Sequence, residues 1–158
     1  MRKRLSYVFV LLAIVTSAAT SARADFIDGR DAYMRQDYQT TLNELRPLAV
    51  EGDMRAQTFM GWLYKKGYGV PQDIAQALVW YKLAADQGHG FSQKELAMAY
   101  YTGNGVPQDL TQAAMWLNLS KLRNYGMADL LLVEAQMDKA SIQRARRMAA
   151  DWTAQHKR

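Results

Sequence analysis

The sequence predicts an all-α protein, a solenoid of stacked helix pairs closed by a helical cap at the C-terminal end. Three observations predict this fold. A segment of the chain returns after 36 residues, the two copies keep their glycines and proline at matching places, and apolar residues elsewhere recur at spacings of three and four. A fixed period of this size is typical of supersecondary units that bury their apolar faces against neighbouring units.

The recurring segment is GYGVPQD at residues 67–73, which returns as GNGVPQD at residues 103–109. Its glycines allow positive φ angles and its proline cannot extend a preceding helix, so each copy predicts a loop between two helices. The repeat motif pairs these residues across the two copies: Tyr64 and Tyr100, Gly67 and Gly103, Gly69 and Gly105, Val70 and Val106, Asp73 and Asp109, Ala77 and Ala113, Trp80 and Trp116.

The first unit, residues 25–52, is expected to be a shortened helix pair. Its second helix is predicted over residues 38–50, because Leu42, Leu45 and Leu48 follow a helical spacing. Pro47 lies inside this pattern and is expected to kink or shorten the helix. Gly52 suits a left-handed helix end, and the residue after it suits the cap of the next helix.

The second and third units, residues 53–88 and 89–126, each predict two helices around the recurring loop. The expected helices cover residues 54–65 and 73–86, then 91–101 and 109 to about 123–126. Asp73 is predicted to cap its helix, with Gln76 near the spacing of a capping box. Gly61 leaves room for a close approach between helices. The remaining residues, 127–158, predict a cap of two helices over 127–137 and 139–154, the second started by Asp138.

Residues 1–24 have the pattern of a cleavable signal peptide. A basic start precedes an apolar run of about 11 residues, which is too short for the roughly 20 needed to span a bilayer. The small-x-small sequence Ala22-Arg23-Ala24 predicts cleavage between Ala24 and Asp25. The expected location is therefore periplasmic or secreted, with no stable membrane insertion after cleavage.

Charge and cysteine content exclude several functions. The chain carries a net charge of +5, and the four basic residues of the first 24 supply +4, which leaves about +1 for the mature protein. No clustered basic footprint for nucleic acid is therefore predicted. The chain has no cysteine, so disulfides and thiol chemistry are excluded.

The second unit closely resembles the repeat of the Sel1-like repeat family, a relative of the tetratricopeptide repeat. The resemblance rests on Tyr64, Gly67, Gly69, Val70, Asp73, Ala77, Trp80, Tyr81, Ala84, Ala85, Gly88 and His89. The third unit is similar, with Leu117 in place of the usual tyrosine, whereas the first lacks the Gly-x-Gly-Val loop. The ending from Met137 to Ala145 resembles the terminal helix of small exported bacterial members.

The resemblance implies a right-handed superhelical scaffold for protein–protein contact, and exported bacterial relatives often act as envelope adaptors. The function expected from it is a non-enzymatic adaptor with an unknown envelope protein as partner. Two alternatives stay open. One is a cell-wall or β-lactam hydrolase, an activity of cysteine-rich relatives, and the other is a self-associating envelope component.

No pattern of catalytic or ligand-binding residues is evident, and no cofactor or metal is expected. His89 occupies the junction between repeats, where a structural hydrogen bond is expected, and His156 lies in a charged tail. No His-x-x-x-His spacing suits a metal, and no serine has an evident base beside it. The arginines at 144, 146 and 147 could face solvent or an anionic surface.

A contact surface is predicted on the first helices of the pairs, which tend to line the concave side of a solenoid. Positions that differ between the repeats can specialise, because packing constrains them less than core positions. Exposed aromatic and methionine side chains are typical interface anchors. The predicted contact residues are Phe59, Trp62, Lys66, Met98 and Tyr101. The alternative for Phe59 and Trp62 is that they belong to the core between repeats.

Overall fold

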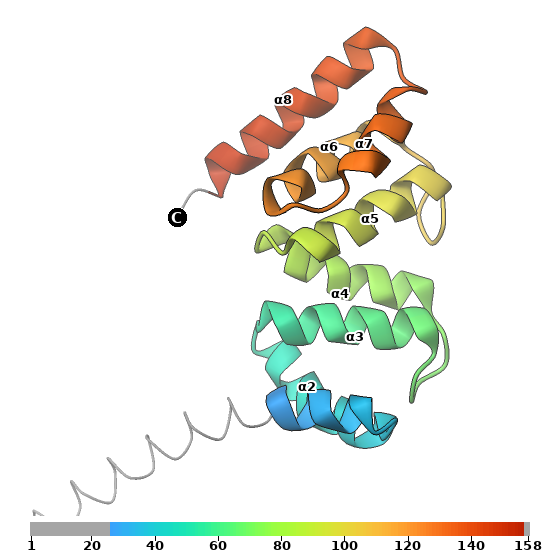
Figure 1. Cartoon of the computed structure of the whole chain (residues 1–158), viewed down its shortest axis with the longest axis vertical. Helices are drawn as coiled ribbons and strands as arrows, with labels where there is room; N and C mark the ends of the chain where they lie inside the picture. Colours follow the sequence, from blue (N-terminus) through green and yellow to red (C-terminus); the bar gives the residue numbers. More distant parts are fainter. Residues whose placement is uncertain (1–25, 157–158) are drawn as a thin grey trace, which may run out of the picture.

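The computed structural model describes residues 26–156, and the signal peptide predicted over residues 1–24 lies outside them. This part of the chain forms an all-α solenoid, in which the helices follow one another along the long axis of the molecule (Figure 1). The first pair consists of a helix over residues 26–34 and α2 (Tyr38–Val50). The second pair is α3 (Met54–Lys66) and α4 (Ile74–Asp86), and the third is α5 (Gly90–Thr102) and α6 (Leu110–Ser120).

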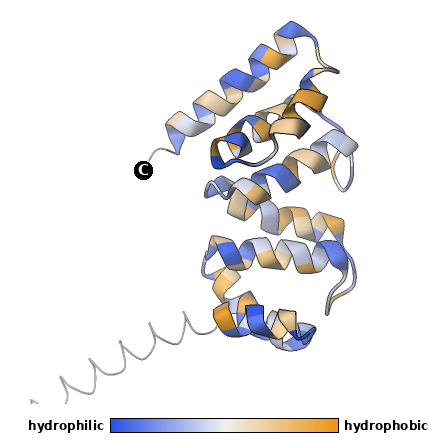
Figure 2. Cartoon of the chain, in the orientation of Figure 1, coloured by the Kyte–Doolittle hydropathy of each residue, from blue (hydrophilic) through white to orange (hydrophobic). Residues whose placement is uncertain are grey.

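Each pair packs on the next, and the apolar residues form two clusters between them. Leu45, Met60 and Leu63 are fully buried where α2 meets α3. A second cluster joins α4, α5 and α6 and includes Tyr81 and Leu117. Figure 2 shows apolar and polar residues alternating along the helices, as expected when one face of each helix is buried.

Aspartate side chains cap the N-termini of most of the helices, as the sequence predicts. Asp53 accepts hydrogen bonds from the backbone N–H groups of Arg55 and Ala56, and Asp73 accepts one from that of Gln76. The reciprocal bond of a capping box is absent at Asp73, because its own N–H donates to the Tyr64 carbonyl. Asp73 caps α4 as predicted, but Gln76 does not complete a capping box. This bond instead ties the end of the loop back to the preceding helix.

The two glycines of the recurring loop have different roles. Gly67 ends α3 in a left-handed conformation, with φ of 73°. Gly69 also has a positive φ, and a Cβ there would lie 2.8 Å from the Cβ of Tyr38 in the preceding pair. A Cβ on Gly105 would likewise lie 2.7 Å from Cγ2 of Ile74 in α4. The second glycine therefore lets each loop touch the helix behind it.

The helix α2 has the predicted bounds, so Pro47 does not shorten it. Two other helix boundaries correct the sequence expectations. The chain after α6 forms a short 3₁₀ helix, η1 (Lys121–Arg123), ended by Asn124 with a positive φ. The next helix, α7 (Met127–Glu134), stops before the predicted Met137.

The last helix, α8 (Lys139–Gln155), closes the stack by packing against α6. Trp152 of α8 meets Trp116 of α6 edge to face, with 6.2 Å between ring centroids. Arg146 pairs with Glu134 at 2.9 Å and so ties α8 to α7. Among the described residues, no helix is long and apolar enough to cross a bilayer.

Candidate protein-binding face

The first helices of the successive pairs are the helix over residues 26–34, α3 and α5, and α7 follows them in the stack. We call these the A helices, and α2, α4, α6 and α8 the B helices. Positions 58, 59, 62, 65 and 66 of α3 recur 36 residues later as positions 94, 95, 98, 101 and 102 of α5. Their spacing places each set on one side of its helix, and together they define the A-helix face.

Polar contacts cross the A-helix face from each A helix to a following element. The Trp62 indole N–H donates to the Tyr33 hydroxyl at 3.0 Å. Lys65 of α3 forms an ion pair with Glu95 of α5. Two further contacts continue the series toward the C-terminal end: Lys94 with Asp129 at 3.1 Å, and Gln136 Nε2 with the Tyr101 hydroxyl at 2.8 Å. The face is therefore held in a fixed arrangement by its own side chains.

The predicted contact residues of α3 gather beside the first pair. The Phe59 ring packs edge to face on Tyr33 at 5.2 Å and on Phe26 at 6.3 Å, as the packing alternative would have it. Trp62 is half-buried, and the Lys66 ammonium stands 4.8 Å from the centre of its ring. Lys66 is exposed. Trp62 and Lys66 thus present one aromatic and one cationic group at the surface.

The predicted contact residues of α5 lie farther along the stack. Met98 lines a small pocket of about 220 Å³ between α3, α4 and α5, whose rim carries the Lys65–Glu95 pair. Tyr101 packs partly against the second apolar cluster, and its hydroxyl accepts the hydrogen bond from Gln136. All five predicted residues are therefore on the A helices, and Lys66 alone of them is exposed.

Tyr81 also lines this small pocket, from α4. Its ring is 1% exposed, and its hydroxyl has no hydrogen-bond partner among residues 26–156. Burial, and secondarily the nearby Glu95 carboxylate, raise the pKa of the Tyr81 hydroxyl far above its usual range. The hydroxyl therefore stays protonated and is not available as a base.

His89 has the structural role expected from its place at a repeat junction. It begins α5, and its Nδ1 accepts from the Ser92 backbone N–H at 3.4 Å. The hydroxyl groups of Thr58 and Ser92 each lie 3.1 Å from the same nitrogen. Burial lowers the pKa of the His89 imidazole. A neutral ring that accepts hydrogen bonds at Nδ1 fits all of these contacts.

The sequence interpretation missed a pair of glutamines that link consecutive helix pairs. Gln57 and Gln93 are buried, and each donates through Nε2 to a carbonyl of the preceding pair, Ala49 or Ala85, at 3.1 Å. Their matching positions in the two repeats were visible in the sequence. A polar residue kept at a buried position of both repeats was the signal that could have revealed them.

The described residues contain no group of three or more His, Asp and Glu side chains placed to hold a metal ion. Two lysines of the A-helix face form ion pairs across helices, Lys65 with Glu95 and Lys94 with Asp129. What this arrangement offers is a rigid surface with aromatic, cationic and thioether groups. Such a surface suits binding.

The family model of the Sel1 repeat matches residues 55–89 and 90–125. The chain carries two Sel1 repeats. Sel1 repeats are generally scaffolds for protein interaction. Among curated proteins, none matches the chain.

Two solved structures resemble the Sel1-repeat chain along most of its length. One is a protective antigen of uropathogenic Escherichia coli strains with an SLR fold, at a TM-score of 0.79 and 25% identity, covering 85% of this chain. The other is a Sel1 repeat protein from Oxalobacter formigenes, at a TM-score of 0.64 and 28% identity, covering 80% of this chain. The match spans 30% of the first protein and 55% of the second.

Proposed function

We propose that the protein is an exported, non-enzymatic scaffold that holds a partner protein of the bacterial envelope on its A-helix face. One observation carries this proposal. Most residues of the recurring loop and several core residues, such as Ala77 and Ala113, are the same in the two repeats, whereas the A-helix face differs at each position, for example Trp62 against Met98 and Lys66 against Thr102. A repeated framework that presents unlike side chains is what recognition of a particular partner needs.

The chemistry of the face supports protein binding. Tryptophan, tyrosine and methionine are enriched at the centres of interfaces, where they contribute large contact areas. The half-buried rings of Trp62 and Tyr101 are already fixed by hydrogen bonds to Tyr33 and Gln136, so binding would cost little of their conformational freedom.

Binding is tested by capture from an envelope extract with mild crosslinking and mass spectrometry. The variant Lys66→Glu reverses the charge of the exposed side chain of the face and spares the hydrogen bonds of Trp62 and Tyr101. We expect it to lose a specific partner that the unchanged protein retains. Val79→Glu is the matched control, because Val79 is 53% exposed on the B helix α4. Equal capture by all three proteins would contradict the proposed face.

Export is proposed from the basic start, apolar run and Ala22-Arg23-Ala24 of the sequence. N-terminal sequencing of the protein recovered from a periplasmic fraction should read Asp25 first. A start at Met1, or recovery in the cytosolic fraction alone, would contradict export.

Self-association is a second candidate function, favoured by one feature of α7. Met127, Leu131 and Leu132 of this short helix are more than half exposed, at 56%, 63% and 58%. Exposed apolar groups gathered on one element are unusual on the surface of a soluble monomer. A second copy of the chain could cover them.

A further inference from the structure

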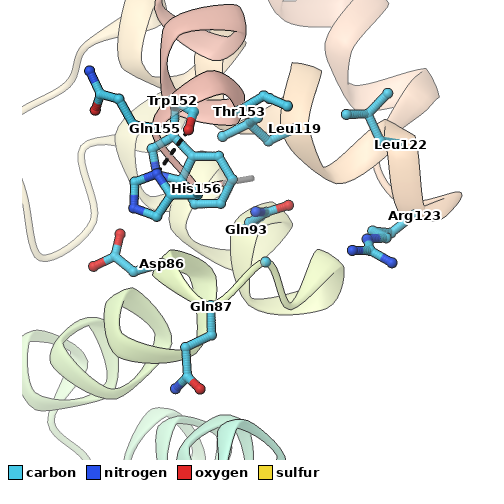
Figure 3. A pocket seen from close by; sticks show the side chains of 11 residues that line it. Asp86, Gln87, Gln93, Leu119, Leu122, Arg123, Trp152, Thr153, Gln155 and His156 are labelled. Atoms are coloured by element: carbon cyan, nitrogen blue, oxygen red, sulfur yellow. Dashed lines mark hydrogen bonds between the residues drawn. The ribbon is translucent and has the colours of Figure 1, made fainter. Parts of the chain in front are cut away.

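A pocket of about 740 Å³ lies where the second helix pair meets the third, with the C-terminal end of α8 as one wall. This volume is within the range of small-molecule and side-chain binding sites. Figure 3 shows Gln93 among the side chains that line it, with Arg123 on one side and the overlapping rings of His156 and Trp152 on the other. The pocket shares no residue with the A-helix face.

Gln93 has an unused hydrogen-bond acceptor. Its side chain is 2% exposed, and Nε2 donates to the Ala85 carbonyl at 3.1 Å. Its Oε1 has no donor among residues 26–156. A buried carboxamide oxygen without a donor is costly, so this atom marks a place where a donor would be bound.

We call the contact of α2 with α3 the first junction and that of α4 with α5 the second junction, where the pocket lies. The first junction shows which donor fits. Gln57, the counterpart of Gln93, donates in the same way to the Ala49 carbonyl at 3.1 Å. There the glutamine oxygen does have a partner, because Gln87 Nε2 donates to Gln57 Oε1 at 2.8 Å and to the Gly52 carbonyl at 3.1 Å. A primary carboxamide from the end of α4 thus completes the first junction.

At the second junction the position of Gln87 is taken by Arg123. Arg123 is exposed, and its Nη2 lies 4.0 Å from the point where a Cβ on Gly88 would be. The guanidinium therefore stands beside Gly88 and makes no hydrogen bond to Gln93. The replacement removes the carboxamide and leaves a cation at the side of the pocket.

We propose that this pocket binds a primary carboxamide, as carried by a glutamine or asparagine, in the place that Gln87 takes at the first junction. The amide N–H of the ligand donates to Gln93 Oε1. The Arg123 guanidinium donates to a carbonyl or carboxylate oxygen next to the carboxamide. The His156 ring, stacked 4.1 Å from Trp152, forms a flat wall for the aliphatic part of the ligand. The site stands independently of partner binding on the A-helix face.

The test is titration of the ¹⁵N-labelled protein with N-acetylglutamine N-methylamide, followed by NMR at the Gln93 carboxamide and the Trp152 indole. Both signals should shift and saturate. N-acetylglutamate N-methylamide has the same shape but no amide donor on its side chain, and should bind about tenfold more weakly or less. A titration with free glutamine shows where the carboxamide comes from. Tighter binding of N-acetylglutamine N-methylamide indicates a glutamine within a peptide, and tighter binding of free glutamine indicates an amino acid ligand.

Two variants complete the experiment. Arg123→Gln supplies the carboxamide of the first junction from the chain itself, so it should fill the site and weaken probe binding about tenfold or more. Val79→Gln introduces the same side chain on the surface of α4 and should leave binding unchanged. Equal binding of the glutamine and glutamate probes, no saturable shift, or binding that Arg123→Gln leaves intact would each overturn the proposal.

Discussion

At the scale of single residues, His89 couples the repeat junction to pH. Its Nδ1 accepts from the Ser92 N–H and lies beside two hydroxyl groups, and burial lowers its pKa from the ordinary value of 6.5. Below about pH 6.5 the unfolded chain takes up a proton that the folded ring resists. The contribution of neutral His89 to stability is therefore complete above this pH and is lost as pH falls through the lowered pKa.

We therefore expect the protein to lose stability between pH 7.5 and pH 5, and His89→Asn to lose less over the same interval. Asparagine can also begin a helix but does not titrate. Urea unfolding of both proteins at the two pH values measures the difference. Parallel losses in the two proteins would show that other groups cause the pH dependence.

The glutamine that completes the first junction gives a second prediction at this scale. Gln87→Ala leaves Gln57 Oε1 buried without its donor and should lower the free energy of unfolding by about 1–2 kcal/mol. Arg123→Gln adds the missing donor at the second junction and should raise it by about 1 kcal/mol. Chemical denaturation of the two variants gives both signs, and a loss of stability in Arg123→Gln would refute the equivalence of the junctions.

At the scale of helices, the approach of α3 to α4 depends on the absence of a side chain. A Cβ on Gly61 would lie 2.7 Å from two ring carbons of Tyr81. The counterparts of this pair in the third helix pair are Ala97 and Leu117, a larger residue on the first helix and a smaller one on the second. In the second pair the smaller residue is on the first helix and the larger on the second, and in the third pair the two residues are closer in size.

Gly61→Ala should therefore cost about 1–3 kcal/mol of stability through overpacking. Adding Tyr81→Leu reproduces the third pair and removes the clashing ring, so the double variant should be more stable than the sum of the single effects. Thermal or urea unfolding of the three variants completes a double-mutant cycle. Strict additivity would mean that Gly61 is needed for its backbone and not for the ring.

How far the sequence predicts this molecule also differs with scale. The loops, the caps and most helix ends follow from glycine, proline and aspartate placed at matching positions, and the structure confirms them. The ends of α6 and α7 do not follow, because the period breaks after the third pair and Asn124 adopts a left-handed conformation. The orientation of Arg123 could not be predicted either, since it depends on the tertiary contacts of η1 with Gly88 and Gly90.

The candidate site was predictable only in part. Differences between repeats point to the A helices, and all five predicted residues lie there. Core packing of Phe59 and Trp62 was one of two alternatives, and the sequence could not decide between them, since both residues depend on Phe26 and Tyr33 of a first pair that lacks the motif. The pocket at the second junction depends on the path of α8, which no periodicity specifies.

At the scale of the whole molecule, the exposed apolar face of α7 bears on how many copies work together. If a second copy covers Leu131 and Leu132, the mass in solution should rise with concentration, and Leu131→Glu/Leu132→Glu should remain monomeric. Light scattering over a hundredfold range of concentration measures this, with Val79→Glu as the control for an added surface charge. A constant monomer mass for the unchanged protein would exclude self-association through α7.

The matching glutamine bonds at the two junctions also bear on how such a chain can change in evolution. Both ends of a 36-residue unit present the same partners, Gln57 to Ala49 and Gln93 to Ala85. An in-frame duplication of the gene segment for one unit would therefore place a new unit between neighbours that already match it. Such an array can gain length in a single genetic event, and the added copy is free to acquire a surface of its own.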